Sequence, residues 1–122
     1  YRKIINYVGY NKNILNMFKK TSIFVLPSYR EGTPKVLIEA LSFGLPIIAS
    51  NIAGCKTIIR HNINGILIPI KRPDILAKAI VELSKNKKKM ALISNNGKKF
   101  AKTNLDIKII TDKHLKIYNQ SL

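Results

Sequence analysis

Two glutamates stand eight positions apart in a chain that is otherwise strongly basic. Glu31 and Glu39 lie in the stretch SYREGTPKVLIEALSFGLPIIAS, within 122 residues that carry 22 lysines and arginines, 6 acidic residues and a formal net charge of +16. An ionised carboxylate accepts two or more hydrogen bonds, so it suits the hydroxyl groups of a sugar and repels a phosphate. A simpler interpretation stays open. Glu31 then interacts only with the dipole of the following helix, and Glu39 only pairs with Lys35, four residues earlier.

Backbone groups between the two glutamates predict an anion site. The N–H groups of Gly32, Thr33, Lys35 and Val36 lie near an expected helix start, where backbone donors lack intrahelical partners and the helix dipole favours negative charge. Pro34 contributes no N–H. Glu31 stands at the rim of this site, so its carboxylate should face something neutral or cationic. The spacing is compatible with a phosphate site beside a carboxylate that holds sugar hydroxyls, and equally with two glutamates that have only the structural roles named above.

Strand and helix patterns alternate along the first 70 residues. The first expected elements are a strand at 3–8, a helix at 11–20 and a strand in SIFVL that is covered on both faces. A helix follows, with Thr33 as its N-cap, Pro34 at its first position and Gly44 just past its end. After it come a buried strand in LPIIAS, a short helix beginning near Gly54, and a strand in GILIPI. Residues 71–122 predict a helical tail with helices at 73–85, 87–102 and 105–118.

This alternation predicts the fold class α/β: a Rossmann-like parallel sheet with helices on both faces, in a single partial domain. Ligand loops of such sheets follow the carboxyl ends of the strands, and PSYREGTP is a loop of that kind. Ser28 in this loop can hydrogen-bond at the strand end, and Tyr29 can either stack on a ligand or stay a plain exposed residue.

Composition limits the other kinds of site. The single cysteine, Cys55, excludes an intramolecular disulfide and is expected to be a buried small side chain. With two histidines and no cysteine partner, a metal site has almost no ligands, and we expect none. No apolar run reaches the ~18–20 residues that span a bilayer. The lysine clusters KNKKKM and GKKFAK suit an anionic membrane surface, a polyphosphate ligand or nucleic acid, or are simply solvated.

The segment PSYREGTPKVLIEALSFGLPIIASNIAGCKTIIRHNINGILIP resembles the C-terminal nucleotide-sugar-binding domain of the family 4 (group 1) retaining glycosyltransferases, which have the GT-B fold. The resemblance runs from about Ile4 to Ile80 and weakens in the helical tail. It includes YVGY, the strand ending in Pro-Ser, the two glutamates as E-x7-E, EALSFGLPIIAS, the glycine of IAGCKTII, and NGILIP, all in the family's order.

The resemblance implies a role for each matching residue. Glu39 would hold the ribose hydroxyls of the nucleotide, and Glu31 would lie beside the donor sugar, either in catalysis or as a sugar-binding group. The other implied donor contacts are the backbone amides of Gly32 and Thr33, Val36 and Leu37 beside the nucleoside, and the turn from Tyr7 to Tyr10 at the base. Apart from the resemblance, Arg30 adjoins Glu31 and could reach an anionic donor or acceptor. Lys35 stands where the family is often apolar, and it would neutralise Glu31, touch the donor or simply pair with Glu39. The donor would be a nucleoside-diphosphate sugar, with no metal or other cofactor.

Two departures from the family pattern are visible. The family often reads Glu-Gly-Phe-Gly where this chain has Glu31-Gly32-Thr33-Pro34, a variant associated with bacterial surface-polysaccharide enzymes. After the IAG turn the family usually has Glu, and this chain has Thr57. The family's phosphate-gripping Arg and Lys lie upstream of the matching segment, and its acceptor site lies mostly in a separate N-terminal domain.

We therefore expect the second half of a C-terminal domain, from an enzyme that transfers sugar to a carbohydrate or lipid-linked acceptor in surface-polysaccharide, capsule or lipopolysaccharide synthesis. The full-length enzyme would be cytoplasmic, with a possible peripheral position at the inner face of an anionic membrane, and this fragment alone would be inactive. Two alternatives remain. One is a basic nucleic-acid-binding module, although aromatics interleaved with lysine are lacking. The other is a catalytically inactive scaffold, which Thr57 and the lacking upstream segments leave open.

Overall fold

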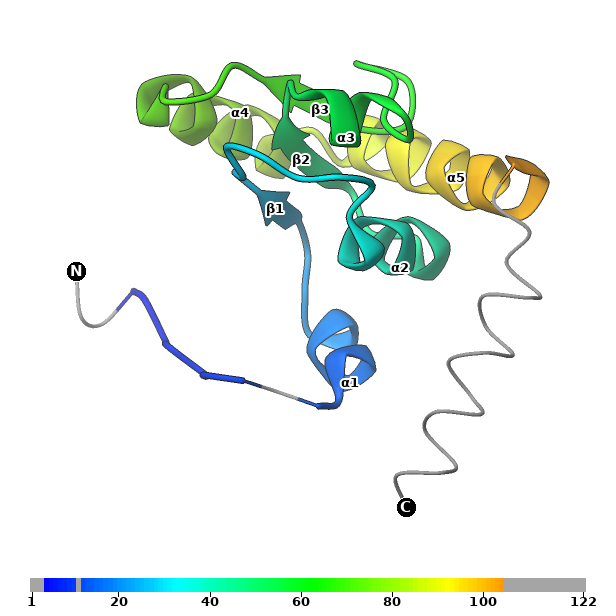
Figure 1. Cartoon of the computed structure of the whole chain (residues 1–122), viewed down its shortest axis with the longest axis horizontal. Helices are drawn as coiled ribbons and strands as arrows, with labels where there is room; N and C mark the ends of the chain where they lie inside the picture. Colours follow the sequence, from blue (N-terminus) through cyan, green and yellow to red (C-terminus); the bar gives the residue numbers. More distant parts are fainter. Residues whose placement is uncertain (1–3, 11, 105–122) are drawn as a thin grey trace.

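A three-stranded parallel sheet lies at the centre of the chain. The computed structural model describes residues 4–10 and 12–104 (Figure 1). Its elements are α1 (Ile14–Lys19), β1 (Phe24–Leu26), α2 (Lys35–Phe43), β2 (Ile47–Ser50), α3 (Ala53–Lys56), β3 (Ile66–Ile68), α4 (Pro73–Lys85) and α5 (Lys87–Asn104). The strand order is β1-β2-β3, and both neighbouring pairs are parallel, with Val25 opposite Ile48 and Ala49 opposite Leu67. The expected α/β class with a parallel sheet is confirmed.

The sheet separates two hydrophobic cores, because helices cover both of its faces. All four residues of the central strand β2 are buried, and its side chains alternate between the two cores: Ile47 and Ala49 face one and Ile48 faces the other. The first core is built with α1, α2 and α3, and its buried members include Phe18, Leu37, Leu41 and Ile58. The second is built with β3, α4 and the first half of α5, and includes Ile66, Leu83 and Ile93. This alternation confirms the expected two-sided cover.

Helix α5 belongs to both cores. Its first half contributes Met90 and Ile93 to the second core, and its second half contributes Phe100 and Ala101 to the first. In Figure 1 it runs from beside α4 to beside α2, and it contacts both helices. The approach to α2 is close, since a Cβ built on Gly97 would lie 2.6 Å from Cδ2 of Leu41. Glycine at position 97 therefore sets the distance between these two helices.

Several predicted boundaries agree with the structure because the local signals are strong. Gly44 ends α2 in the left-handed conformation (φ 90°), as a C-terminal glycine should. Helix α4 spans the predicted residues 73–85, and α5 extends the predicted helix 87–102 by two residues. Asn13 caps α1, its Oδ1 accepting a hydrogen bond from the Asn16 N–H at 3.3 Å, so that helix starts later than residue 11. The helix predicted at 105–118 lies outside the described residues.

One strand prediction needs correction. The strand predicted at 3–8 is absent from residues 4–8, which are exposed, with Ile4 at 85% and Tyr7 at 91% of full exposure. A strand requires a neighbour to accept its backbone hydrogen bonds, and in Figure 1 this segment runs apart from the sheet. The strand β1 is covered on both faces, as predicted, because Phe24 and Leu26 pack against the first core and Val25 against the second, and all three side chains are partly buried. Among the described strands it pairs with β2 alone, so its other edge is open.

Candidate functional site

Three loops that leave the carboxyl ends of the strands form the region where the sequence predicts a ligand. The strands are parallel and in register, so the loop after Leu26, the turn after Ser50 and the loop after Ile68 emerge at one edge of the sheet. The turn after β2 is tied to β3, because the Asn51 N–H donates to the Ile68 carbonyl at 2.7 Å. The predicted residues Glu31 and Gly32 lie in the first of these loops.

Glu31 is held within its own loop by a serine. The Ser28 hydroxyl donates a hydrogen bond to Oε1 of Glu31 at 2.9 Å, three residues along the chain. Glu31 itself is exposed, so its second carboxylate oxygen and the remaining lone pairs face solvent. The serine fixes the direction of the carboxylate and leaves it able to accept further hydrogen bonds from hydroxyl groups.

Gly54 supports the same loop from below. A Cβ built on Gly54 would clash with the carbonyl oxygens of Glu31 and Gly32, at distances below the 3.0 Å that real Cβ atoms keep. Gly54 is buried at the start of α3, so this short helix packs directly against the loop backbone. The glycine of the IAG turn is therefore required by the close contact between α3 and the Glu31–Gly32 backbone.

Gly32 is different, because nothing in the chain requires a glycine at its position. A Cβ built on Gly32 has no neighbouring atom within 4 Å, and its φ lies outside the left-handed region. A side chain at this position would project into open space at the predicted ligand site. The fold would tolerate such a side chain. Packing within the chain therefore does not explain the glycine, whereas a ligand that occupies this space would explain it.

Helix α2 starts at a different N-cap from the predicted one, but its first turn still presents free backbone N–H groups. Thr33 was predicted as the N-cap, but Pro34 occupies that place with an extended backbone (ψ 120°), and no side chain caps the helix. The Pro34 carbonyl accepts the N–H groups of Leu37 and Ile38. The N–H groups of Lys35 and Val36, in the first turn, have no intrahelical acceptor and point out of the helix end, as an anion site requires.

Side chains of α2 fall on two sides. Lys35 is exposed and Glu39 is partly buried, whereas the partly buried Val36 packs against the first core. Leu37, however, is fully buried in the first core, so its side chain is closed to a ligand, and this argues against its predicted contact with a nucleoside. Glu39 lies four residues after Lys35, about 6 Å further along the helix axis.

The predicted base-contacting turn is not packed against the site in this structure. Tyr10 is 90% exposed and lies in the segment before α1, where Gly9 has a positive φ of 65°. Arg30 and Thr33 are exposed in the loop with Glu31. The structure therefore brings Glu31, Gly32 and the first turn of α2 together, and leaves Tyr10 without a described contact to them.

Two neighbouring residues are structural rather than reactive. Cys55 is fully buried, as predicted, and burial raises the pKa of its thiol, with the negative charge of Glu31 raising it further. A protonated thiol is a poor nucleophile. Thr57, where the family usually has Glu, donates its hydroxyl hydrogen to the Gly54 carbonyl at 2.7 Å and so closes the last turn of α3.

A cavity of about 210 Å³ opens at the same edge of the sheet, beneath the loop that follows β3. Its lining includes Tyr29 from the first loop, Ser50 at the end of β2, and Lys71 and Arg72. Arg72 forms a two-pronged ion pair with Asp74, at 3.0 and 2.9 Å, which lowers the pKa of that carboxyl to about 2. Tyr29 is expected near a ligand from the sequence, whereas Lys71 is not, although it directly follows the predicted strand GILIPI.

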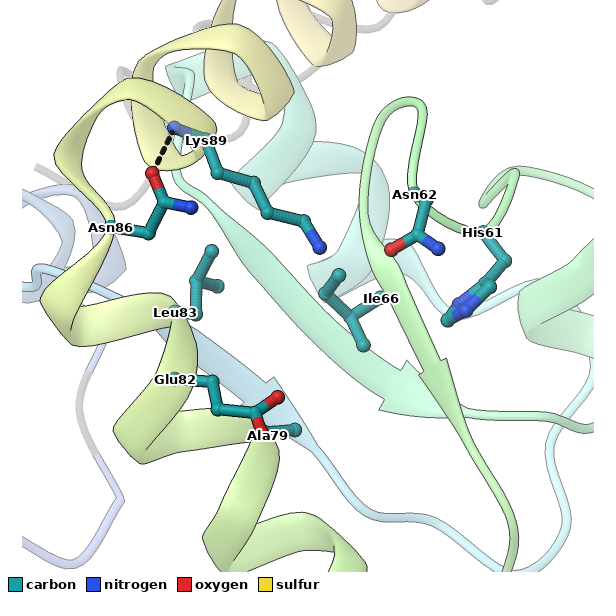
Figure 2. A pocket seen from close by; sticks show the side chains of 8 residues that line it. All are labelled: His61, Asn62, Ile66, Ala79, Glu82, Leu83, Asn86 and Lys89. Atoms are coloured by element: carbon teal, nitrogen blue, oxygen red, sulfur yellow. Dashed lines mark hydrogen bonds between the residues drawn. The ribbon is translucent and has the colours of Figure 1, made fainter.

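A second cavity, of about 500 Å³, lies at the opposite end of the sheet (Figure 2). Ile66, the first residue of β3, and Leu83 line it with polar groups of His61, Glu82 and Lys89. The backbone N–H of Lys89 donates to Asn86 Oδ1 at 3.0 Å and caps α5. This cavity contains none of the predicted site residues.

The described residues form neither a cluster of metal ligands nor a helix able to span a membrane. Residues 4–10 and 12–104 hold no group of three or more His, Cys, Asp or Glu side chains arranged to bind a metal ion. Across the same part of the chain, every helix is too short or too polar to cross a bilayer.

Most of the chain is similar in sequence to known proteins. The model of the family "Glycosyl transferases group 1" matches residues 2–100. A curated relative from Escherichia coli, "UDP-Gal:alpha-D-GlcNAc-diphosphoundecaprenol alpha-1,3-galactosyltransferase", is 36% identical over 86 residues, which cover 70% of this chain and 22% of the relative. The chain thus spans about a fifth of the length of that protein.

Solved structures show the same fold. Anabaena Alr3699/HepE, solved in complex with UDP, superposes with a TM-score of 0.84 and 21% identity over 98% of this chain and 33% of that one. The C-terminal domain of a group 1 family glycosyl transferase (LpcC) from Francisella tularensis gives a TM-score of 0.72 and 24% identity, covering 83% of this chain and 52% of that domain. The present chain is thus similar to about half of one such domain.

Proposed function

This chain belongs to the group 1 glycosyl transferases and carries part of the C-terminal domain of their GT-B fold, and from that premise we propose that it binds a nucleoside-diphosphate sugar for a retaining glycosyltransferase. The observation that carries the proposal is the Glu31–Gly32 loop. Ser28 and Gly54 hold it at the carboxyl edge of the sheet, with open space over Gly32 and free backbone donors at the start of α2.

The proposed roles follow from these positions. The N–H groups of Lys35 and Val36 receive part of the diphosphate, since helix starts bind anions. The exposed carboxylate of Glu31 accepts hydrogen bonds from the donor sugar, and Glu39 holds the ribose hydroxyls. Gly32 leaves room for the sugar to approach the loop. Arg30, Thr33 and Tyr10 complete the donor contacts in the proposal.

Catalysis in this proposal depends on stabilising the departing diphosphate. Charge develops on the leaving phosphate in the transition state, and fixed donors aimed at it lower the barrier. The α2 start supplies two such donors, which is too few to neutralise a diphosphate. We therefore propose that further cations come from sequence beyond this chain, as does the acceptor site, and that the 122 residues alone do not transfer sugar.

The acceptor is proposed to be a lipid-linked or surface-polysaccharide glycan at the cytoplasmic face of a membrane. The E. coli relative is named for a diphosphoundecaprenol acceptor, which supports a lipid-linked substrate here. Turnover in a transfer assay with the isolated chain would contradict the proposal that these 122 residues alone do not transfer sugar.

A binding experiment tests the donor site directly. Isothermal calorimetry with UDP-, GDP- and ADP-sugars on the full-length protein should show binding of at least one donor. Replacing Glu39→Ala should weaken that binding by roughly 10- to 100-fold, the effect of losing hydrogen bonds to a charged group. Glu82→Ala is the matched control, because Glu82 is an exposed helical glutamate on α4, paired with Lys78 at 3.9 Å. Equal affinity of the wild type and the Glu39 variant would remove Glu39 from the site.

A further inference from the structure

Two clusters of exposed lysines lie on α5, one near each end of the helix. The helix buries Ile93, Gly97 and Ala101, one residue per turn. Outside this buried stripe the helix carries five exposed lysines, which together are called the basic face: Lys87 and Lys88 in the first turn, and Lys98, Lys99 and Lys102 in the last two turns. At 1.5 Å per residue the basic face is about 22 Å long.

No acidic residue balances this charge within the helix. The 18 residues of α5 include neither Asp nor Glu, and within the described ranges none of the five lysines takes part in a salt bridge. Helix α4 is built differently, because its charged residues include Asp74, paired with Arg72, and Glu82, paired with Lys78. Like charges at i,i+4, such as Lys98 and Lys102, destabilise a helix slightly. The neighbouring helix α4 therefore balances its charges, whereas α5 does not.

The geometry of the basic face suits an extended anionic surface. The inner side of α5 is committed to both cores, so the helix cannot rotate to present other residues. Leu92 lies among the lysines and is 56% exposed, which gives the face an apolar side chain able to enter the boundary between headgroups and acyl chains. Clusters of four to eight cations on a helix are typical of binding to anionic lipids, at about 1 kcal/mol for each well-placed lysine.

We propose that the basic face of α5 docks the protein on an anionic phospholipid bilayer. The choice of a bilayer over a nucleic acid rests on the proposed function, because a lipid-linked acceptor is met at a membrane. Docking itself is independent of donor binding, since none of the five lysines belongs to the Glu31–Gly32 loop or to α2. Attraction of this kind weakens as salt rises, because exposed charges are screened within about 8–10 Å at physiological ionic strength.

Vesicle co-sedimentation tests the proposal with a charge-matched pair of variants. The full-length protein should sediment with phosphatidylcholine vesicles containing phosphatidylglycerol and not with phosphatidylcholine alone. The triple variant Lys88→Gln, Lys99→Gln, Lys102→Gln should weaken this binding roughly 100-fold. Lys98 is left intact because its side chain lies over Gly44. The control Lys19→Gln, Lys20→Gln, Lys56→Gln removes the same charge from exposed sites on α1 and α3 and should change binding much less.

Two outcomes overturn the proposal: binding that is indifferent to phosphatidylglycerol, and equal losses in both triple variants, which would show an effect of net charge only. A duplex DNA arm distinguishes the other polyanion, and DNA binding that depends on the basic face without vesicle binding also overturns it. Circular dichroism confirms that both variants fold. Loss of donor binding with intact vesicle binding would contradict the proposed function and leave this inference standing.

A single tryptophan gives a second readout. The 122 residues contain no tryptophan, so Leu92→Trp adds a single indole to this part of the full-length protein, and the signal is the difference from the wild type. Its fluorescence should shift to shorter wavelength on adding anionic vesicles, because the indole leaves water. Val81→Trp, at a similarly exposed position on α4 (49%), should not shift. An unchanged spectrum for Leu92→Trp, or equal shifts for both, would contradict the proposed orientation.

Discussion

The carbonyl oxygen of Gly32 lies so close to Gly54 that no Cβ fits between them. This contact joins two segments that stand 22 positions apart in the sequence and leave neighbouring strands of the sheet, β1 and β2. It holds the loop that presents Glu31 against the first turn of α3. The position of the candidate donor site therefore depends on a backbone-to-backbone contact that needs no side chain.

Replacing Gly54→Ala should displace the Glu31–Gly32 loop. The added methyl group would clash with backbone atoms of Glu31 and Gly32, and backbone atoms cannot rotate away as a flexible side chain would. We expect a loss of about 1–3 kcal/mol in the free energy of unfolding, the usual range for overpacking, together with weaker donor binding. Urea unfolding and calorimetry measure the two effects, and a fully stable variant with unchanged donor affinity would contradict the contact.

Replacing Gly32→Ala should separate stability from binding. No atom of the chain lies within 4 Å of the new methyl group, and the backbone is not left-handed. Reduced freedom of the unfolded chain should raise the free energy of unfolding by roughly 0.4–1 kcal/mol. Donor affinity should fall at least tenfold in the proposed site, because the methyl group occupies the space of the sugar. Unchanged affinity would mean that the donor does not approach Gly32.

Asn64 should be sensitive to substitutions that keep its size. It is 1% exposed, its Nδ2 donates to the Ile58 carbonyl at 3.0 Å, and its Oδ1 accepts the Arg60 N–H at 2.7 Å. Asn64→Leu leaves two buried backbone groups without partners, at about 1–3 kcal/mol each. Thermal unfolding measures the loss. Asn62→Leu, at an exposed position in the same turn, serves as the control, although its positive φ of 62° adds some strain.

The thiol of Cys55 should be unreactive in the folded chain. Burial raises its pKa above the ordinary value of 9.0, and the charge of Glu31 adds to this. The group is therefore protonated in the folded state, and any stability that it contributes is present below pH 9 and declines as the pH rises further. Iodoacetamide at pH 8 should label Cys55 slowly in buffer and rapidly in urea. Equal rates would show that the thiol is accessible.

The ion pair before α4 predicts an acid-dependent effect. Arg72 lowers the pKa of Asp74 from 3.8 to about 2, so the pair stabilises the folded chain above pH 3.8 and is lost as the pH falls toward 2. Asp74→Asn should therefore be less stable than the wild type at pH 7 and equally stable near pH 2. Both side chains are exposed, so the difference should also shrink in high salt. A difference that persists at pH 2 would point to another cause.

Local signals in the sequence predicted those elements whose partners lie within the chain. Gly44 ended α2, and the run IIAS became a strand buried on both faces, because helices on each side of it are part of the same 122 residues. Residues 4–8 also carry an apolar pattern but form no strand, because they run apart from the open edge of β1 and pair with none of the described strands (Figure 1). Periodicity reports which residues are suited to burial, and the partner decides whether burial occurs.

The sequence predicts which residues form the candidate site, but not the contacts that hold them in place. Glu31 and the start of α2 follow from a loop between a strand and a helix, which sequence signals indicate well. The hydrogen bond from Ser28 and the contact with Gly54 depend on how two loops meet in space. Leu37 shows the same limit, because adjacent residues of a helix point in different directions and only packing decides which of them is buried.

Helix α5 has a mechanical consequence, because it is the element shared by the two cores. Ile93 and Ala101 are eight residues apart on one rigid helix, yet they anchor opposite sides of the sheet. Detaching α5 would open both sides at once, so the sheet and its flanking helices should unfold as one cooperative unit. The same stiffness means that any surface which grips α5 also fixes the tilt of the strands, and with it the direction in which the Glu31 loop faces.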